Sequence, residues 1–199
     1  VGGKNINELN LTTLPNLEHL DISSSTAFEH IIFCKNPDGS NFNKLKYLKC
    51  DKSNIISIRY AVYDTDQNVK TFCNLKGLNN LEYCSFKQCT KLTSVKDLYF
   101  HINNPPAAFS NCINLETLTG DFVLSGNVEG YGDESYEPGI IGFFERCYKL
   151  KDIPAKFVMK NVTSARSFFA FTKLISYDVI RKTIGLMSDK CKDLSFFEY

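Results

Sequence analysis

The sequence lacks several features that would assign it to a common class of protein. It has no Trp and only three His, and no apolar run approaches the ~20 residues that a membrane-spanning helix needs. Its eight cysteines include no C-x-x-C pair. The ligand spacing of zinc ribbons and the redox motif of thioredoxin-like proteins are therefore both missing.

Motifs of catalysis and of nucleic-acid binding are also missing. His19, His30 and His101 stand in no metalloprotease pattern, and no glycine-rich phosphate loop occurs. The adjacent carboxylates Asp133 and Glu134 lack the spacing of a calcium-binding loop. The net charge is only +1, with no dense basic run. We therefore expect no enzymatic activity, no cofactor, no metal, no nucleic-acid partner and no membrane insertion.

The sequence does contain a repeated hydrophobic pattern. Residues 81–95 read L-x-x-C-x-F-x-x-C-x-x-L-x-x-V, in which alternate positions favour a strand and the later ones return to the core. Five other stretches fit the same frame. The turn positions are Ser25, Ser53, Cys89, Cys112, Cys147 and Phe171, which are 28, 36, 23, 35 and 24 residues apart. This spacing indicates a period of 23–24 residues with about a dozen residues inserted in two places.

Such a pattern is typical of a leucine-rich repeat, in which each repeat buries its apolar side only against its neighbours. We expect one domain over residues 1–199, an α/β-type right-handed solenoid of about six repeats. It would carry a parallel sheet on its concave side and an irregular convex side with 3-10 turns and little helix. Inserted loops are expected near 59–72 and 120–139, and a C-terminal cap over 176–199 with a helix at 177–187.

The frame also predicts the core. Four phenylalanines, Phe86, Phe109, Phe144 and Phe168, are expected to form one internal column. Four leucines, Leu92, Leu115, Leu150 and Leu174, are expected to form a second. Cys89, Cys112 and Cys147 are interpreted as buried thiols inside the turns, because a free Cys behaves as a small apolar residue with a weak donor.

The motif F-x-x-C-x-x-L occurs three times within residues 86–150. The fuller strings FSNCINLETL and FFERCYKLKDIP resemble the BspA-like leucine-rich repeat family, over about residues 81–178. The chain departs from the family pattern in its two insertions, in a missing Gly before the Phe, and at Phe171. The resemblance implies an extracellular or cell-surface protein that binds other proteins, with a virion component as the alternative.

The outward positions of the expected strands are the natural binding surface of a solenoid. The candidate partner-binding residues are Tyr47, Lys49, Tyr83, Ser85, Ile141 and Phe143 on the strands, with Tyr131 and Tyr136 in the acidic inserted loop. An alternative interpretation is that the protein's own inserted loop covers Ile141 and Phe143.

Three functions remain open at this point. The first is a non-enzymatic recognition module for a protein or cell-surface ligand. The second is a structural subunit of a larger assembly, such as a virion, phage tail or surface layer, in which exposed Phe143 and Phe169 are buried against a neighbour. The third is an intracellular adaptor resembling F-box proteins.

Overall fold

The computed structural model describes residues 7–33, 44–60, 73–76, 78, 81–101, 108–125, 142–154, 156–160, 168–174 and 184–185. These residues form strands, turns and extended segments, without a helix. Accordingly, nothing in these ranges qualifies as a membrane-spanning helix.

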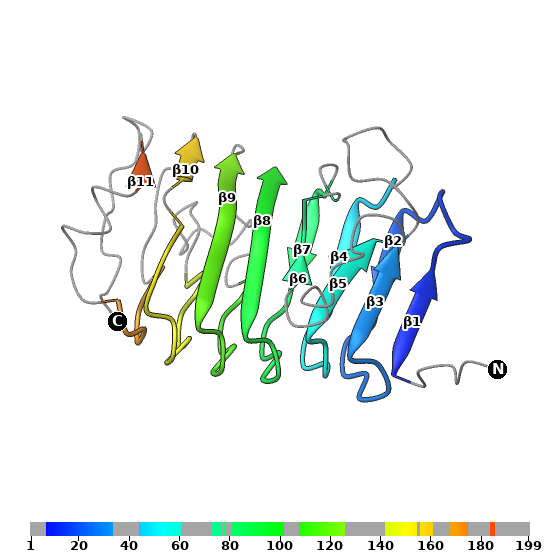
Figure 1. The fold of residues 1–199 in the computed structure, drawn as a ribbon, viewed down its shortest axis with the longest axis horizontal. Helices are drawn as coiled ribbons and strands as arrows, with labels where there is room; N and C mark the ends of the chain where they lie inside the picture. Colours follow the sequence, from blue (N-terminus) through cyan, green and yellow to red (C-terminus); the bar gives the residue numbers. More distant parts are fainter. Residues whose placement is uncertain are drawn as a thin grey trace, which may run out of the picture.

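Two parallel sheets make up the described part of the chain (Figure 1). The larger has eight strands in the spatial order β1 (Glu8–Leu11), β3 (His30–Phe33), β5 (Ser57–Tyr60), β6 (Cys73–Asn74), β8 (Ser94–His101), β9 (Thr117–Ser125), β10 (Lys156–Lys160) and β11 (Ile184–Gly185). The smaller has three, in the order β2 (His19–Asp21), β4 (Tyr47–Lys49) and β7 (Tyr83–Ser85). Strands β1 and β11 lie at opposite ends of the row in Figure 1.

Six short turns precede strands of the larger sheet, and we call them the corners: 22–25, 50–53, 86–89, 109–112, 144–147 and 169–172. In each, the fourth residue donates its N–H to the carbonyl of the first, as Cys112 does to Phe109 at 3.2 Å. Neighbouring corners are also hydrogen-bonded in register. The Asn111 N–H donates to the Glu145 carbonyl, and the Arg146 N–H to the Ala170 carbonyl, both at 2.8 Å.

The third residue of every corner has a left-handed backbone. These residues are Ser24, Lys52, Gln88, Asn111, Arg146 and Phe171, with φ between 58° and 61°. Left-handed backbone costs roughly 1–2 kcal/mol for a residue with a side chain. The same conformation recurs six times without a single glycine, so the hydrogen bonds and the packing of the corners together offset its cost.

The predicted aromatic column is present over its first three members. Phe86 and Phe109 are stacked with ring centroids 5.3 Å apart, and Phe109 and Phe144 likewise at 5.3 Å. The fourth member is Phe169, whose ring is stacked on Phe144 at 5.7 Å, and not the predicted Phe168. Phe168 instead stacks on Phe143 at 5.3 Å.

The last corner is therefore shifted by one residue from the predicted frame. Thr172 occupies the position of the turn cysteines, because its N–H donates to the Phe169 carbonyl at 3.2 Å. Phe171 takes the left-handed position before it and is 40% exposed. Adjacent phenylalanines at 168 and 169 make two frames equally hydrophobic, so the pattern did not distinguish them.

The three turn cysteines are buried and bonded as expected for structural thiols. The Cys89 thiol donates to the Cys50 carbonyl at 2.9 Å, Cys112 to Phe86 at 3.1 Å, and Cys147 to Phe109 at 3.2 Å. Each acceptor belongs to the preceding corner. The thiols thus tie successive corners together, and burial raises their pKa above the ordinary range.

The larger sheet lies where an irregular side was expected. It is built from the segments that follow the corners, while the segments before them form only the three-stranded sheet. The alternation in β9, where Phe122 and Leu124 are fully buried and Val123 is half-buried, is the period-two signal of a strand. Apolar residues occur both before and after each turn. The sequence frame took its strands from the apolar alternation before the turn, so it did not predict the strands that follow the turn.

Three expected boundaries also change. The loop expected at 120–139 begins later, because residues 120–125 belong to β9, and residues 59 and 60 of the other loop belong to β5. Within the helix expected at 177–187, Ile184 and Gly185 form β11 and pair with Phe157 and Val158 of β10. The rest of that segment lies outside the described residues.

Candidate functional site

The outward side of the three-stranded sheet brings three aromatic rings together. Strand pairing aligns His19 of β2 with Tyr47 of β4, and Tyr47 with Tyr83 of β7. The first two rings stack with centroids 4.0 Å apart and planes at 5°, and the second two at 4.3 Å and 11°. The residues between them in the strands, such as Leu48 and Cys84, are buried on the opposite side. We call this stack the aromatic ladder.

A second row runs beside the ladder, and its charged end is open to solvent. Asp21 is exposed and Lys49 is half-buried, while Ser85 is buried. The Asp21 carboxylate accepts the Ser23 N–H at 2.9 Å, and hydrogen bonding to Ser23 lowers the pKa of Asp21. Ser85 donates its hydroxyl to Asp51. Asp21 and Lys49 supply charges of opposite sign beside the ladder.

The ladder is ordered before any partner arrives. Tyr47 has both of its ring faces covered by the other two rings, while His19 and Tyr83 each have one face covered, and the ladder also offers ring edges, two phenol groups and an imidazole. Burial, together with the neighbouring Tyr47, raises the pKa of Tyr83 to about 12, so its phenol stays neutral in ordinary conditions. We call His19, Asp21, Tyr47, Lys49 and Tyr83 the recognition face.

The structure separates the predicted partner-binding residues into three groups. Tyr47, Lys49 and Tyr83 lie together on the recognition face, as predicted. Ser85 is only 4% exposed and Phe143 is fully buried, so their expected exposure is wrong. The remaining three, Ile141, Tyr131 and Tyr136, lie outside the described residues.

Phe143 is buried because its segment is a turn. An extended strand would alternate Phe143 and Phe144 between two sides. In the turn that begins at Gly142, which has φ of 61°, both rings enter the core and meet edge to face at 4.9 Å. Ala108 is 1% exposed in the equivalent place one corner earlier. The outward aromatic row predicted at this end of the molecule is therefore part of the core.

A Ser–His pair on the larger sheet was not predicted. The Nδ1 atom of His30 lies 2.8 Å from the Ser57 hydroxyl, across the pairing of β3 with β5. Glu8 is aligned with His30, but its carboxylate forms an ion pair with Arg59. Ser57 is fully buried, so its hydroxyl does not present a nucleophile to a substrate. The pair serves as a hydrogen bond between strands.

The cysteines form a second group of side chains with chemical potential. Six cysteines fall within the described ranges, and all are free and buried. In the same ranges no group of three or more His, Cys, Asp or Glu has the arrangement to hold a metal ion. The burial of the thiols raises their pKa, which lowers the fraction of reactive thiolate.

The sequence frame missed a group of exposed apolar residues at the corners. Ile113 is 38% exposed, Tyr148 is 48% exposed, and Phe171 is 40% exposed. The first two each follow directly after a turn cysteine. The residue directly after each corner faces away from the core. An apolar residue at this position in the sequence therefore predicts an exposed apolar side chain.

Comparisons with known proteins assign no family. No protein-family model, no curated protein and no solved structure matches this chain.

Proposed function

We propose that the chain is a non-enzymatic recognition module that binds a protein ligand through its recognition face. The observation that carries the proposal is the aromatic ladder of His19, Tyr47 and Tyr83. Tyr is a common anchor of protein interfaces, because it contributes a large contact area and a hydrogen bond with little loss of side-chain entropy. Here that entropy is already reduced by stacking, which favours affinity through preorganisation.

The charges beside the ladder support a protein ligand in particular. Asp21 and Lys49 have opposite signs, so the face selects a partner with complementary charges instead of a uniformly charged polymer. Such pairs contribute to orientation and to the rate of association more than to affinity. The described part of the face holds a single histidine and no hydroxyl positioned by it, which leaves catalysis without support.

We further propose that the two sheets belong to a leucine-rich-repeat solenoid of the BspA-like type. Six corners with one shared backbone conformation and one shared hydrogen bond support this assignment, as does an aromatic column that runs through the last four of them. By that resemblance we place the protein outside the cell or at the cell surface, with a virion as the alternative. The proposal of a structural subunit loses its specific argument, because Phe143 and Phe169 are fully buried.

The proposal is tested by affinity capture from the surface fraction of the source organism, followed by titration of the captured protein. A double variant, Tyr47→Ala with Tyr83→Ala, removes two rings of the ladder. Loss of anchors of this kind costs more than about 1 kcal/mol each, so we expect the dissociation constant to rise at least about tenfold.

Tyr99→Ala is the matched control. Tyr99 is also a half-buried tyrosine on a strand, but it lies on β8 of the larger sheet and donates to Asp121 at 2.8 Å. It should leave binding unchanged. If the captured protein binds the ladder variant and the wild type equally, the recognition face is not the site and the proposed function is wrong in its central feature.

A further inference from the structure

A second surface lies on the corners nearest the C-terminal end of the larger sheet. Exposed apolar and basic side chains meet there. We call it the corner patch, and it consists of Ile113, Arg146, Tyr148, Lys149, Phe171 and Lys173. Of the four large apolar side chains that are exposed in the described residues, three belong to it. Single exposed apolar residues are ordinary, but a group of them marks an interaction site.

Backbone hydrogen bonds place these residues side by side. Because the Asn111 N–H bonds to the Glu145 carbonyl, corner 109–112 runs in register with corner 144–147. Ile113 and Tyr148 therefore occupy equivalent positions about 4.8 Å apart, the usual separation of neighbouring strands. In the same way, the bond from the Arg146 N–H to the Ala170 carbonyl aligns Arg146 with Phe171.

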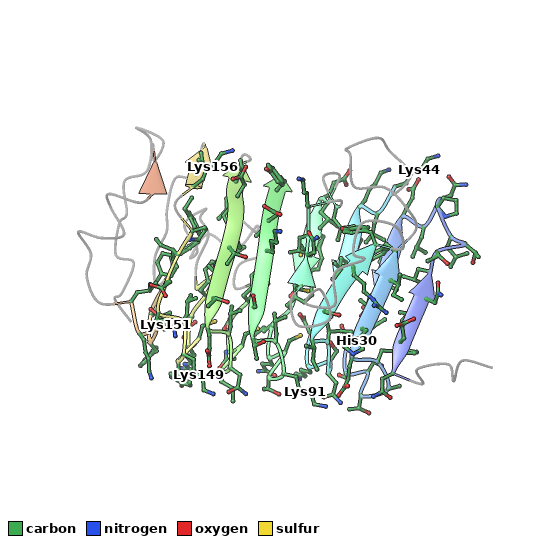
Figure 2. All side chains as sticks on the ribbon, viewed as in Figure 1. His30, Lys44, Lys91, Lys149, Lys151 and Lys156 are labelled. Atoms are coloured by element: carbon green, nitrogen blue, oxygen red, sulfur yellow. The ribbon has the colours of Figure 1, made fainter. Side chains whose placement is uncertain are left out.

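Side-chain and backbone contacts extend the patch. The Arg146 guanidinium lies 5.6 Å from the centroid of the Phe171 ring, a cation–π distance. The Lys173 N–H donates to the Leu150 carbonyl at 2.8 Å, which brings Lys173 next to Lys151. Figure 2 shows Lys149 and Lys151 on one border of the molecule, and Lys44 on the opposite border.

The fold does not require this composition. The residues equivalent to Ile113 and Tyr148 in the earlier corners are polar: Thr26, Asn54 and Thr90. These positions are exposed or half-exposed as well, and each directly follows a corner with the same turn bond. An apolar side chain there gains nothing from the core. The change from polar to aromatic and basic residues at the last corners is therefore unexplained by stability.

The charges of the patch indicate an acidic partner. Lys149 and Lys173 are exposed, and neither forms an ion pair with another described residue. Arg146 is partly neutralised by Glu145 at 3.3 Å. We infer that the corner patch binds an acidic protein segment that places an apolar side chain between Tyr148 and Phe171 and carboxylates against Lys149 and Lys173.

A protein segment fits better than a nucleic acid or a sulfated glycan. Glu145 and Asp152 lie among the basic residues, and both would repel the closely spaced charges of a polyanion. A peptide can direct its carboxylates to the lysines and leave those positions uncharged. Exposed Ile113 also suits an aliphatic or aromatic side chain, which a sulfated glycan does not have.

The test measures binding of a fluorescein-labelled acidic peptide, rich in Glu and carrying two Phe, by fluorescence anisotropy. A peptide with every Glu changed to Lys is the specificity control. We expect a dissociation constant below about 100 µM for the acidic peptide, which corresponds to a modest, single-segment interface. We also expect weaker binding at about 0.5 M than at about 0.05 M NaCl, because salt screens exposed charges.

Two variants test whether the peptide binds at the corner patch, and a third variant is the control. Tyr148→Ala should weaken binding about tenfold as the loss of an aromatic anchor. Lys149→Glu should weaken it about fivefold or more, while Lys44→Glu, with the same change of charge at a distant exposed site, should leave it unchanged. All three replace exposed side chains, so their melting temperatures should match the wild type.

Several results would overturn the inference. They are no binding of the acidic peptide, equal loss in Lys149→Glu and Lys44→Glu, or tighter binding of heparin or of a single-stranded oligonucleotide to the same residues. The ladder variant with Tyr47→Ala and Tyr83→Ala should bind the peptide normally. The proposals for the corner patch and for the recognition face are therefore tested independently.

Discussion

Truncation of Phe109 provides a quantitative test of how the corners are held together. This side chain is fully buried, and its ring is 5.3 Å from those of Phe86 and Phe144 and 5.5 Å from that of Phe143. Replacement of a buried Phe by Ala costs about 3–5 kcal/mol, through lost burial and the cavity left behind. Because Phe109 stands between two stacked neighbours, we expect Phe109→Ala to fall in the upper half of that range.

Phe109→Leu separates the contribution of stacking from that of burial. Leu keeps most of the apolar area but not the ring stacking, and each stacked pair contributes about 0.5–1.5 kcal/mol beyond burial. Because the variant removes the stacking on both Phe86 and Phe144, we expect a cost of about 1–3 kcal/mol. Urea unfolding followed by far-UV circular dichroism gives both values, with an unchanged slope as the sign that only stability has changed.

The control is Phe171→Ala, which removes the same ring from a 40% exposed position at the left-handed residue of the last corner. Its cost should stay below about 1 kcal/mol, since an exposed ring loses little burial. If Phe171→Ala destabilised the protein as much as Phe109→Ala, the assignment of inside and outside at the corners would be refuted.

Three other measurements test separate features. Gly120→Ala should destabilise the protein by at least about 1–2 kcal/mol in urea unfolding, because its φ is 75° and an added Cβ would clash with the Asp97 carboxylate; an unchanged midpoint would contradict this packing. Native protein at pH 8 should expose no more than two of its eight thiols to Ellman's reagent, since six are free but buried, and unfolding should release the rest; rapid reaction of Cys112 in particular would contradict its position. Tyr83 should ionise near pH 12 in a spectrophotometric titration compared with Tyr83→Phe, and the stability that its raised pKa contributes, complete below the ordinary tyrosine value of about 10, should be lost as the pH rises through 12; ionisation near 10 would mean that the ring is not buried by the ladder.

Much of the core could be predicted from the sequence. The frame places Phe86, Phe109 and Phe144 in one column and Cys89 and Cys112 inside the turns, and all five are fully buried. These positions are predictable because successive corners present apolar residues to one another at the same offset from each turn. The same offset recurring at several turns is stronger evidence for a buried position than one match to the pattern.

Positions with two adjacent phenylalanines could not be placed in the same way. Phe143 was expected outside because a strand alternates its side chains, but a turn allows both it and Phe144 to enter the core. At residues 168 and 169 the hydrophobic pattern fits two frames, and the hydrogen bond of Thr172 to Phe169 decides between them. Local backbone conformation, which a hydrophobic pattern does not encode, made the difference.

The recognition face was predictable in part. Tyr47, Lys49 and Tyr83 follow from the alternation of β4 and β7, so their common face could be read from spacing. Their close ring stacking depends on the exact alignment of strands 36 residues apart, as Tyr47 and Tyr83 are. Which residues meet in the corner patch depends on how whole turns are aligned with one another. The repeat pattern of the sequence predicts this alignment only approximately.

The corners have a further consequence for how such a protein can change over time. Successive corners begin 28, 36, 23, 35 and 25 residues apart, yet each repeats the same turn bond. The N–H···O=C bonds that align neighbouring corners join main-chain atoms, so these bonds do not depend on the identity of most outward side chains. We therefore expect such a chain to tolerate insertions between corners and substitutions of outward residues on them. A lineage built on this plan can acquire a new ligand by altering its periphery while its interior stays the same.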